Sequence, residues 1–524
     1  MASPDVTAKS HLLPAILFAA VCAGFCVPAG ADVTLARLFR DHAVLQRDAA
    51  IPVWGTADPG EQVAVVVGND RSTATADAQG HWRVTLPPRP ASAQGVEIAV
   101  TGKNRITVRD VLVGDVWLAS GQSNMEMAFF WTEQGKAAAK AVDVPLIRIF
   151  KVKAKPQETP QPSLEQGGWT VCTPGNNVVN LTQLGYYFAR ELQQKLGVPI
   201  GIIDSSCSGT SIDAWMSAAA LAADPAGPAV HERWQKRLAE YPAAKARYEE
   251  AKAAWEAAKA AAKAEGKPFT KPSPWPPSGP GSTQAPSGLY NAMIHPLVPY
   301  GLRGVIWYQG ENNTKRPDLY RTLLPSLIRG WRSDFARNEL PFYWVQLPNY
   351  NMGTEFGDDW AGLREAQAMA LALPNTGQAV TIDIGEGNNI HPNNKPEVAR
   401  RLALVALART YGDKTVRDSG PVFDRAEFHG GDPVRIHFKQ VAAGLKNKAG
   451  DDAGPLAGFE MAGADKVFHP AEARLDGATN TVRVSAKGVP APVAVRYAWR
   501  NNPTGLNLVN SAGLPLAPFR TDTW

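Results

Sequence analysis

The sequence predicts an α/β protein in which a mostly parallel sheet is covered by helices on both faces and flanked by β-rich modules. Between residues 110 and 412, short apolar runs alternate with helical stretches, which is typical of parallel sheets with crossover helices. Before and after this region, β-branched runs separated by turn residues predict antiparallel modules. A chain of 524 residues also exceeds the roughly 250–300 residues that one hydrophobic core serves, so we expect several domains.

Five apolar runs are the predicted strands of the parallel sheet, and each is followed by a polar loop and a helical stretch. They span residues 116–119, 202–204, 305–308, 342–346 and 380–384. The last run leads through a loop into a predicted helix over residues 397–410. Alternation of this kind places helices on both faces of the sheet.

A helical insertion is predicted at about residues 217–285. Residues 229–265 are rich in Ala, Lys and Glu, and a segment rich in Pro and Gly follows. We expect Pro242 to divide the insertion into two helices. Its aromatic residues recur seven apart, and this stripe favours packing against the parent domain over a glycan-binding surface. The stripe consists of Trp234, Tyr241, Tyr248 and Trp255.

The chain divides into four segments on these patterns. Residues 1–31 resemble an export signal, because Lys9 precedes an apolar run and small residues follow it. The run is shorter than the ~20 residues of a membrane span, so we expect a periplasmic or secreted protein without one. Residues 32–109 are predicted as an N-terminal β-sandwich, 110–412 as the α/β domain and 413–524 as a C-terminal β-rich module.

Composition argues against several classes of function. The net charge is only +5 and no basic stripe interleaved with aromatic residues occurs, so we expect no nucleic-acid partner. The histidines are scattered singly, and the sequence has no phosphate loop or dinucleotide fingerprint; we expect neither a metal nor a cofactor. Cys172 and Cys207 can form one disulfide or remain two buried thiols, and both alternatives stay open. The sequence predicts no particular oligomeric state.

Ser123 gives the first chemical signal, because Gly121-Gln-Ser-Asn-Met125 directly follows the predicted strand at 116–119. A serine at a strand-to-helix turn exposes its hydroxyl, and the N–H groups at the start of the helix can stabilise a developing oxyanion. Taken alone, such a serine is more often a helix N-cap than a nucleophile.

Three other predicted strands are followed by residues that could assist a serine nucleophile. The strand at 202–204 runs into a serine-rich loop that contains Gly209, and the strand at 305–308 runs into Gln309-Gly-Glu-Asn-Asn313. The strand at 380–384 leads to His391. In an open α/β sheet the C-terminal strand ends line one crevice. The sequence therefore predicts a nucleophile, a base, an acid and oxyanion donors along one edge.

These blocks resemble the sialate O-acetylesterase family, a branch of the SGNH (GDSL-like) hydrolases related to acetylxylan esterases. The resemblance rests on Gly114-Asp-Val-Trp-Leu-Ala-Ser-Gly-Gln-Ser-Asn-Met125, Trp307-Tyr-Gln-Gly-Glu311 and Ile390-His-Pro392. It covers essentially the whole chain after the signal except the insertion. It implies an SGNH-hydrolase-like three-layer α/β/α domain.

The resemblance also implies a serine esterase that removes O-acetyl groups from a carbohydrate. Ser123 would be the nucleophile and His391 the general base, forming an acetyl-enzyme that water then hydrolyses. The oxyanion would be held by the N–H groups of Ser123 and Gly209 and by one side-chain amide. Both Gln309 and Asn313 fit that last role.

The acid that orients the histidine departs from the pattern of the wider superfamily. Asn388 occupies the position three residues before His391, where an aspartate is common. A neutral amide can orient an imidazole but cannot stabilise an imidazolium by charge. We expect Glu311 to be the third member, with Asp383 and Glu386 as alternatives. A serine–histidine dyad assisted by a backbone carbonyl is the remaining alternative.

The predicted substrate is an acetylated oligosaccharide or polysaccharide, either a hemicellulose such as xylan or xyloglucan or an O-acetylated sialic acid. Trp215, Trp307 and Trp499 are candidates to stack on sugar rings, with core packing as an equal alternative for each. Arg303, Lys315 or Arg316 would supply a basic subsite for the carboxylate of sialic acid. Gln122 is a further expected substrate contact. His295 is a rival base, but we expect it to satisfy a buried backbone group instead.

A noncatalytic carbohydrate-binding protein with a vestigial site is the alternative from another class. The joint presence of Ser123, Glu311 and His391 argues against it. No Gly-x-Ser-x-Gly segment occurs, which disfavours an α/β-hydrolase. If His391 is the base, activity is expected to fall as the pH drops through about 6–7.

Overall fold

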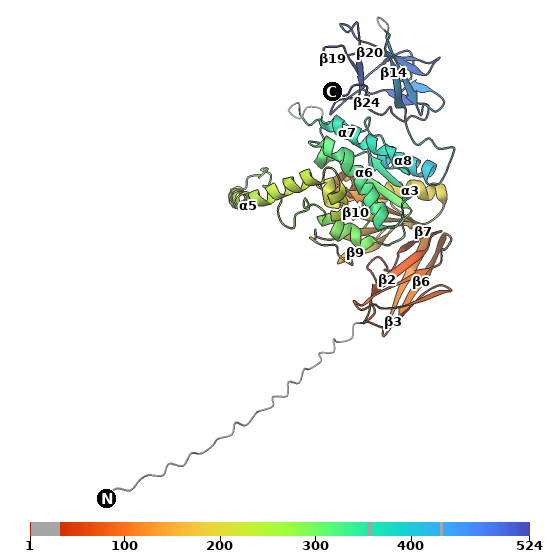
Figure 1. Cartoon of the computed structure of the whole chain (residues 1–524), viewed down its shortest axis with the longest axis vertical. Helices are drawn as coiled ribbons and strands as arrows, with labels where there is room; N and C mark the ends of the chain where they lie inside the picture. The colour runs from red at the N-terminus through yellow and green to blue at the C-terminus, as the bar shows by residue number, and fades with distance from the viewer. Residues whose placement is uncertain (2–31, 354–358, 430–432) are drawn as a thin grey trace.

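The computed structural model describes Met1 and residues 32–353, 359–429 and 433–524. The predicted export signal at 1–31 lies outside the described residues, apart from Met1. The chain forms an N-terminal β-module, a central α/β part and a C-terminal β-module, arranged in that order along the long axis (Figure 1). Within the described residues, no helix combines the length and apolar character needed to cross a membrane.

The central sheet has the strand order β13-β12-β11-β7-β10-β8-β9. All neighbours from β13 to β8 are parallel, and β9 is antiparallel at the edge, which confirms a mostly parallel sheet. The strands are β7 (Arg105–Gly121), β8 (Val144–Lys153), β9 (Gln166–Cys172), β10 (Ile200–Ser206), β11 (Gly304–Tyr308), β12 (Phe342–Val345) and β13 (Thr376–Ala379).

The strand predicted at 380–384 is wrong, whereas the other four predicted strands are confirmed. Strand β13 ends at Ala379, and Val380 and Ile382 lie in the hydrophobic cluster of the C-terminal module. Between them, Thr381 Oγ1 donates to the Gln346 carbonyl at 2.6 Å. The apolar run therefore reflects burial between two parts of the molecule and not membership of the sheet.

Helices cover both faces of the sheet, as two adjacent residues of β12 show. Phe342 packs against Trp331 of α6, with ring centroids 5.9 Å apart. Tyr343 packs against Trp117, which in turn meets Phe188 of α3. Because successive side chains of a strand point to opposite faces, α3 and α6 lie on opposite sides. The helices of this part are α1 (Ser123–Glu126), α2 (Glu133–Lys140), α3 (Gln183–Leu196), α4 (Ala218–Ala223), α6 (Pro317–Asp334), α7 (Asp359–Met369) and α8 (Lys395–Arg409).

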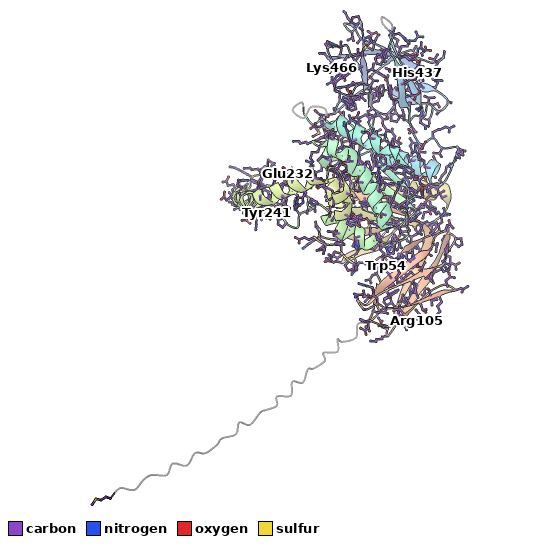
Figure 2. The ribbon with its side chains drawn as sticks, viewed as in Figure 1. Trp54, Arg105, Glu232, Tyr241, His437 and Lys466 are labelled. Carbon is purple, nitrogen blue, oxygen red and sulfur yellow. The ribbon has the colours of Figure 1, made fainter. Side chains whose placement is uncertain are left out.

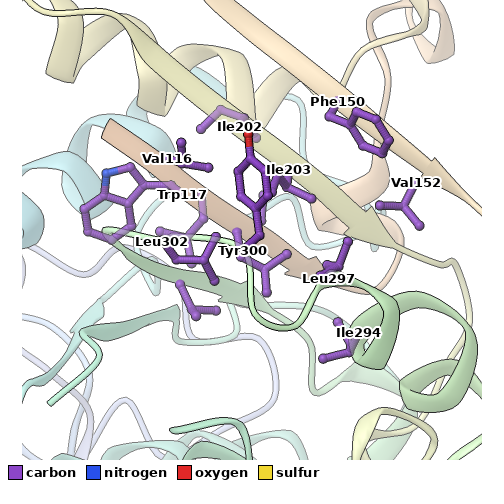
Figure 3. Packing of buried hydrophobic residues seen from close by; sticks show 14 of the residues in the cluster. Val116, Trp117, Phe150, Val152, Ile202, Ile203, Ile294, Leu297, Tyr300 and Leu302 are labelled. Atoms are coloured by element: carbon purple, nitrogen blue, oxygen red, sulfur yellow. The ribbon is translucent and has the colours of Figure 1, made fainter. Parts of the chain in front are cut away.

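A continuous hydrophobic cluster underlies this sheet (Figure 3). Val116 and Trp117 of β7 belong to it, together with Ile202 and Ile203 of the neighbouring strand β10. Burial on this scale, at about 25 cal/mol per Å² of apolar surface, makes the central strands rigid supports for the loops at their ends.

Strand β7 is shared by two sheets. Up to Gly114 it pairs with β1 (Val44–Gln46) and β6 (Ser92–Thr101), and beyond that residue it pairs with β10 and β11. The boundary predicted between residues 109 and 110 therefore falls inside a continuous strand. One run of backbone joins the N-terminal module to the strand end that carries Ser123.

Both flanking parts are built from antiparallel strands. In the N-terminal module, β2 (Ile51–Thr56) pairs with β5 (His81–Leu86), and β3 (Gln62–Val67) pairs with β4 (Asp70–Thr75) and β6. The C-terminal module contains sheets of five, four and two strands. Its strands are β14 (Val422–Glu427), β15 (Val434–Lys439), β16 (Leu445–Asn447), β17 (Pro455–Leu456), β18 (Phe459–Ala462), β19 (Phe468–Pro470), β20 (Glu472–Asp476), β21 (Thr481–Ser485), β22 (Ala494–Tyr497), β23 (Leu508–Asn510) and β24 (Phe519–Arg520).

The insertion contains one long helix, so the predicted break at Pro242 is wrong. Helix α5 (Gly227–Ala264) continues through Pro242 and projects from the side of the central part, with Tyr241 on the projecting arm (Figures 1 and 2). Pro242 is exposed, so water can satisfy the carbonyl that the proline leaves without a donor. The flanking Ala, Glu and Lys residues also favour helix.

The aromatic stripe of α5 packs on the return segment of the insertion itself. Trp255 Nε1 donates to the Lys271 carbonyl at 2.7 Å, and the Trp255 ring meets Phe269 edge-on. Gly279 lies directly against the Tyr241 ring. The predicted packing of these two stripe residues against the parent domain is therefore wrong, because the chain after the helix folds back along it.

Cys172 and Cys207 are both free thiols, so the disulfide alternative is not found. Burial raises the pKa of each thiol to about 12. At neutral pH both side chains are therefore protonated and behave as small apolar groups.

Asp115 of β7 holds together three segments that are distant in sequence. Its fully buried carboxylate accepts hydrogen bonds from Arg47 at 3.0 Å, from Arg303 Nε at 2.8 Å and from the Tyr411 hydroxyl at 3.0 Å. Arg47 follows β1, Arg303 precedes β11 and Tyr411 follows α8. This cluster therefore ties the N-terminal module to the central sheet.

Replacing Asp115 by Ala is expected to lower the free energy of unfolding by about 3–5 kcal/mol, because it leaves Arg47 and Arg303 without their buried counter-charge. Urea denaturation followed by circular dichroism measures the change. Glu249→Ala, which breaks the exposed pair of Glu249 with Lys245 on α5, is the control and should cost less than about 1 kcal/mol. Equal effects of the two substitutions would contradict the anchoring role of Asp115.

Candidate active site

Ser123 stands at the sharp turn between β7 and α1. Gly121 ends the strand with φ of +132°, and a Cβ at this position would collide with the Tyr308 carbonyl. The turn therefore requires glycine. Ser123 is the first residue of α1, so its hydroxyl emerges at the C-terminal edge of the sheet beside N–H groups that have no helical acceptor.

His391 reaches Ser123 from the loop between β13 and α8. Its Nε2 lies 2.7 Å from Ser123 Oγ, which is within the hydrogen-bond reach of a general base. The Asn389 side-chain oxygen accepts a hydrogen bond from the His391 backbone N–H at 3.0 Å. Trp131 packs edge-on against the imidazole, with ring centroids 5.7 Å apart. The structure thus brings together the predicted nucleophile and the predicted base.

Two buried side chains clamp the backbone on both sides of His391. Asn124 Nδ2 donates to the Ile390 carbonyl at 2.9 Å, and Lys395 Nζ donates to the Pro392 carbonyl at 2.5 Å. The clamps are themselves joined, since Lys395 Nζ also donates to Asn124 Oδ1 at 2.8 Å. The carbonyls before and after the imidazole are therefore held by groups packed under the nucleophile.

Glu311, the predicted acid, contacts Asn124 and not the imidazole. Glu311 Oε1 accepts a hydrogen bond from Asn124 Nδ2 at 2.5 Å. Its Oε2 is buried and has no hydrogen-bond partner among the described residues. The prediction that Glu311 binds the His391 ring directly is corrected: the carboxylate reaches the histidine loop through Asn124.

The two alternative acids are engaged elsewhere. Asp383 forms an ion pair with Arg401, with N–O distances of 2.6 and 3.0 Å. Glu386 accepts hydrogen bonds from Asn389 Nδ2 at 2.9 Å and from the Asn393 backbone N–H at 2.6 Å, and so shapes the loop. In the part of the chain that the structure describes, no carboxylate accepts a hydrogen bond from the imidazole of the base.

Burial shifts the ionisation of three side chains at this site. Burial raises the pKa of Glu311, and it lowers the pKa of Lys395 to about 7 against the opposing charges of Glu311 and Glu386. Burial, and then the Lys395 charge, lowers the pKa of His391. His391 is therefore neutral at neutral pH and able to accept the serine proton.

Asn313 keeps a side-chain N–H group without a partner among the described residues, whereas the Gln309 side-chain amide nitrogen already donates two hydrogen bonds. Asn313 lies in the short helix η6 (Glu311–Asn313), and its Oδ1 accepts hydrogen bonds from Gln309 Nε2 at 2.7 Å and from the Ile212 N–H at 3.0 Å. Gln309 Nε2 also donates to the Thr210 carbonyl. These bonds use the Gln309 amide and orient Asn313, whose Nδ2 is buried without a partner among the described residues.

Gly209 lies in the loop beside the nucleophile turn. Strand β10 pairs Ser206 with Gly121, and the Cys207 N–H donates to the Gly121 carbonyl at 3.1 Å. Gly209 has φ of +69°, and Asn312 Nδ2 donates to its carbonyl at 3.0 Å. The bond from Asn312 holds the peptide between Gly209 and Thr210, which directly follows the Gly209 N–H that the sequence predicts as an oxyanion donor.

Two of the three tryptophans that are candidates to stack on sugar are core residues. Trp215 and Trp307 have no exposed surface and pack edge-on against each other at 6.1 Å. Trp215 Nε1 donates to Thr210 Oγ1 at 2.9 Å. A side chain without exposed surface cannot contact a sugar, so the core-packing alternative is confirmed for both residues and the stacking alternative is wrong.

The predictions that Arg303 and Gln122 contact the substrate are wrong, because both side chains are bound within the protein. Arg303 is bound to Asp115, six residues before Gly121 on β7 and so away from the nucleophile. Gln122 is buried, and its Oε1 accepts hydrogen bonds from the N–H groups of Gly310 and Asn312 at 3.4 and 3.3 Å. It holds the loop after β11.

His295 contacts a backbone carbonyl, as expected from the prediction that it has a structural role and is not the base. Its Nδ1 lies 2.8 Å from the Gln161 carbonyl, and its ring meets Tyr290. Across residues 32–353, 359–429 and 433–524, no group of three or more His, Cys, Asp or Glu side chains is arranged to hold a metal ion.

Three residues at the site were not singled out from the sequence: Asn124, Trp131 and Lys395. Asn124 follows the nucleophile directly, so its place in the Ser123 block is a usable signal. Lys395 opens α8 four residues after His391, but a lysine at a helix start is usually exposed, and nothing in the sequence indicates that this one is fully buried.

The chain is similar to known proteins in both sequence and structure. The model of the family described as carbohydrate esterase, sialic acid-specific acetylesterase matches residues 113–255 and 274–408. The sialate O-acetylesterase of Rattus norvegicus is 30% identical over 76% of this chain and 77% of its own, and that of Homo sapiens is 29% identical over 97% and 95%. The crystal structure of a carbohydrate acetylesterase from Xanthomonas citri has 41% identity and a TM-score of 0.79, covering 94% of this chain and 100% of that one.

Replacing Lys395 by Met is expected to slow the reaction of Ser123 with a fluorophosphonate by about tenfold to hundredfold. The substitution keeps most of the side-chain volume but releases the Pro392 carbonyl and Asn124, and misplacement of a base by about 1 Å costs on the order of a hundredfold. Labelling kinetics followed by mass spectrometry measure the effect. Lys245→Met on the exposed face of α5 is the control, and an unchanged rate in a folded Lys395→Met protein would contradict the clamp.

Proposed function

The chain belongs to the carbohydrate esterase family of sialic acid-specific acetylesterases, and we propose that it deacetylates carbohydrates through an acetyl-enzyme on Ser123. It is a carboxylic ester hydrolase, as its carbohydrate and sialate O-acetylesterase relatives indicate. The observation that carries the proposal is the 2.7 Å hydrogen bond between Ser123 Oγ and His391 Nε2 at the C-terminal edge of the sheet.

The proposed reaction has two halves. Ser123 Oγ attacks the acetyl carbonyl while His391 Nε2 takes the hydroxyl proton, and the tetrahedral intermediate collapses as His391 returns that proton to the departing sugar oxygen. Water then attacks the acetyl-serine with His391 again as base, and collapse releases acetate and restores the serine. Each step moves one proton through the same imidazole nitrogen.

Oxyanion stabilisation is assigned in this proposal to the N–H groups of Ser123 and Gly209 and to Asn313 Nδ2. The support is that Asn313 Nδ2 is buried, oriented by two hydrogen bonds to its own oxygen, and without a partner among the described residues. A preoriented donor of this kind needs no rearrangement when the negative charge develops.

Glu311 acts in this proposal as a positioning residue. Its carboxylate holds the Asn124 amide, which holds the Ile390 carbonyl next to the base. The Ser123–His391 pair is then a dyad whose geometry is fixed through the backbone on both sides of the imidazole.

The leaving group in the proposal is a sugar hydroxyl of a hemicellulose such as xylan or xyloglucan, or of an O-acetylated sialic acid. We further propose that residues 1–31 direct the protein to the periplasm or out of the cell, where such substrates occur. The noncatalytic carbohydrate-binding alternative is disfavoured by the hydrogen bond between Ser123 and His391 and by the unpaired Asn313 amide, which a binding protein does not need.

Acetate release from a small acetyl ester and from acetylated xylan, xyloglucan and O-acetyl sialic acid tests the proposal. Ser123→Ala is expected to abolish release from all of them, and Asn313→Ala to lower kcat by about 10²–10³ as for loss of one oxyanion donor. Ser485→Ala, at an exposed serine at the end of β21 in the C-terminal module, is the matched control. Full activity of Ser123→Ala would rule out the nucleophile assignment.

The pH dependence of kcat/KM reports the pKa of the general base, which is His391 in this proposal. Burial and the Lys395 charge hold the pKa of His391 below its usual value of about 6.5, so activity should persist at neutral pH and fall only as the pH drops below about 6.5. In Lys395→Met the positive charge is gone, the pKa of His391 rises, and this acid limb should move to higher pH. A profile that stays flat down to about pH 4 would rule out His391 as the base.

A further inference from the structure

A hollow of about 720 Å³ opens between the short helix that follows α1 and the edge strands of the central sheet. It is lined by Trp131 and Phe130 of the short helix η1 (Phe129–Trp131) and by residues of β8 and β9. Trp131 is also the ring that packs edge-on against His391. Trp131 therefore connects the lining of the hollow to the imidazole, and the size of the hollow falls within the roughly 300–1,000 Å³ of small-ligand sites.

Two neighbouring aromatic rings face solvent at this hollow. The exposed fractions of Phe130 and Trp131 are 48% and 36%, whereas most large apolar side chains of the central part are buried. Adjacent exposed rings leave apolar surface in water, which is costly unless a ligand covers it. The apolar face of a pyranose ring is a ligand of this kind, because its C–H groups stack on aromatic rings.

The polar groups around these rings are uncharged amides. Gln166, Asn177 and Asn180 line the hollow with exposed side chains, and none of the three side-chain amides has a hydrogen-bond partner among the described residues. Each amide can both donate and accept, which matches sugar hydroxyl groups, since these also do both.

The charges at the hollow are largely balanced. Lys151 Nζ is bound to the buried Asp204 at 2.9 Å and lies 3.9 Å from Glu126, so its charge is compensated from within the protein. Lys153 is the remaining cation of the lining, and no arginine lines the hollow. Recognition of a sugar carboxylate favours the paired N–H groups of arginine, and Arg303 is bound to Asp115 elsewhere.

Resting on the proposed esterase activity, we infer that this hollow is the glycan subsite and that it binds uncharged pyranose residues next to the scissile acetyl ester. Phe130 and Trp131 form its stacking surface, and the three amides bind sugar hydroxyls. The substrate class is thus an acetylated neutral oligosaccharide or polysaccharide, and an acidic sugar such as sialic acid is disfavoured.

Isothermal titration calorimetry with full-length Ser123→Ala protein tests the subsite without turnover. The titrants are an acetylated xylo-oligosaccharide, an acetylated xyloglucan oligosaccharide and O-acetyl sialic acid. A neutral oligosaccharide should bind more tightly than the sialic acid. Adding Phe130→Ala or Asn180→Ala should weaken neutral binding about three- to tenfold, as expected for one stacking contact or one hydrogen bond.

Trp275→Ala is the matched control, because Trp275 is an aromatic residue with 90% of its surface exposed on the return segment of the insertion. This substitution should leave oligosaccharide binding unchanged. Unchanged affinity in both Phe130→Ala and Asn180→Ala would overturn the subsite. Tighter binding of O-acetyl sialic acid than of either neutral oligosaccharide would overturn the substrate class.

Hydrolysis of 4-nitrophenyl acetate separates this inference from the proposed function. In otherwise wild-type protein, Phe130→Ala and Asn180→Ala should lower the ratio of kcat/KM on the oligosaccharide to kcat/KM on 4-nitrophenyl acetate by about three- to tenfold. If wild-type protein releases acetate from no ester while the calorimetric result stands, the esterase proposal fails and the glycan subsite remains. If esters are hydrolysed but the ratio does not change, the subsite fails and the esterase stands.

Discussion

The position of Ser123 depends on β7 being one continuous strand. Its first part is a member of the N-terminal module, its second part lies between β10 and β11, and its end is the turn at Gly121. Hydrogen bonds on both sides fix the direction in which this strand leaves the sheet. Gly209 and Asn313, the proposed oxyanion donors, follow the two neighbouring strands, so the same ladder sets their place relative to Ser123.

The loop that carries His391 is not part of a strand ladder. Buried ionisable and amide side chains hold it by hydrogen bonds instead. Glu311, Asn124 and Lys395 form a connected chain of hydrogen bonds under the nucleophile, ending on the two carbonyls beside the imidazole. Removing two opposite charges from water is costly, and only good geometry offsets that cost. These bonds hold the backbone on both sides of His391 while its imidazole lies within hydrogen-bond distance of Ser123, as the proposed role of base requires.

Local sequence patterns predicted four of the five proposed strands of the parallel sheet. They failed at two places where the same pattern is compatible with two different structures. The run at Val380 and Ile382 is apolar because the C-terminal module covers it, and periodicity does not distinguish that contact from a place in the sheet. Pro242 disfavours helix by its own backbone chemistry, yet an exposed position within a long helix-forming stretch tolerates it.

The sequence by itself determined the mixed α/β architecture, the strand ends followed by Ser123 and Glu311, and the family, because each depends on residues that are neighbours along the chain. Tertiary structure alone decided that Glu311 holds Asn124 and that Asn313 Nδ2, unlike Gln309 Nε2, has no partner among the described residues. It also decided that Trp307 is buried while Trp131 packs against His391. The physical reason is that burial and hydrogen-bond pairing join residues far apart in sequence: Asn124 bonds to Glu311 across 187 positions and to Lys395 across 271.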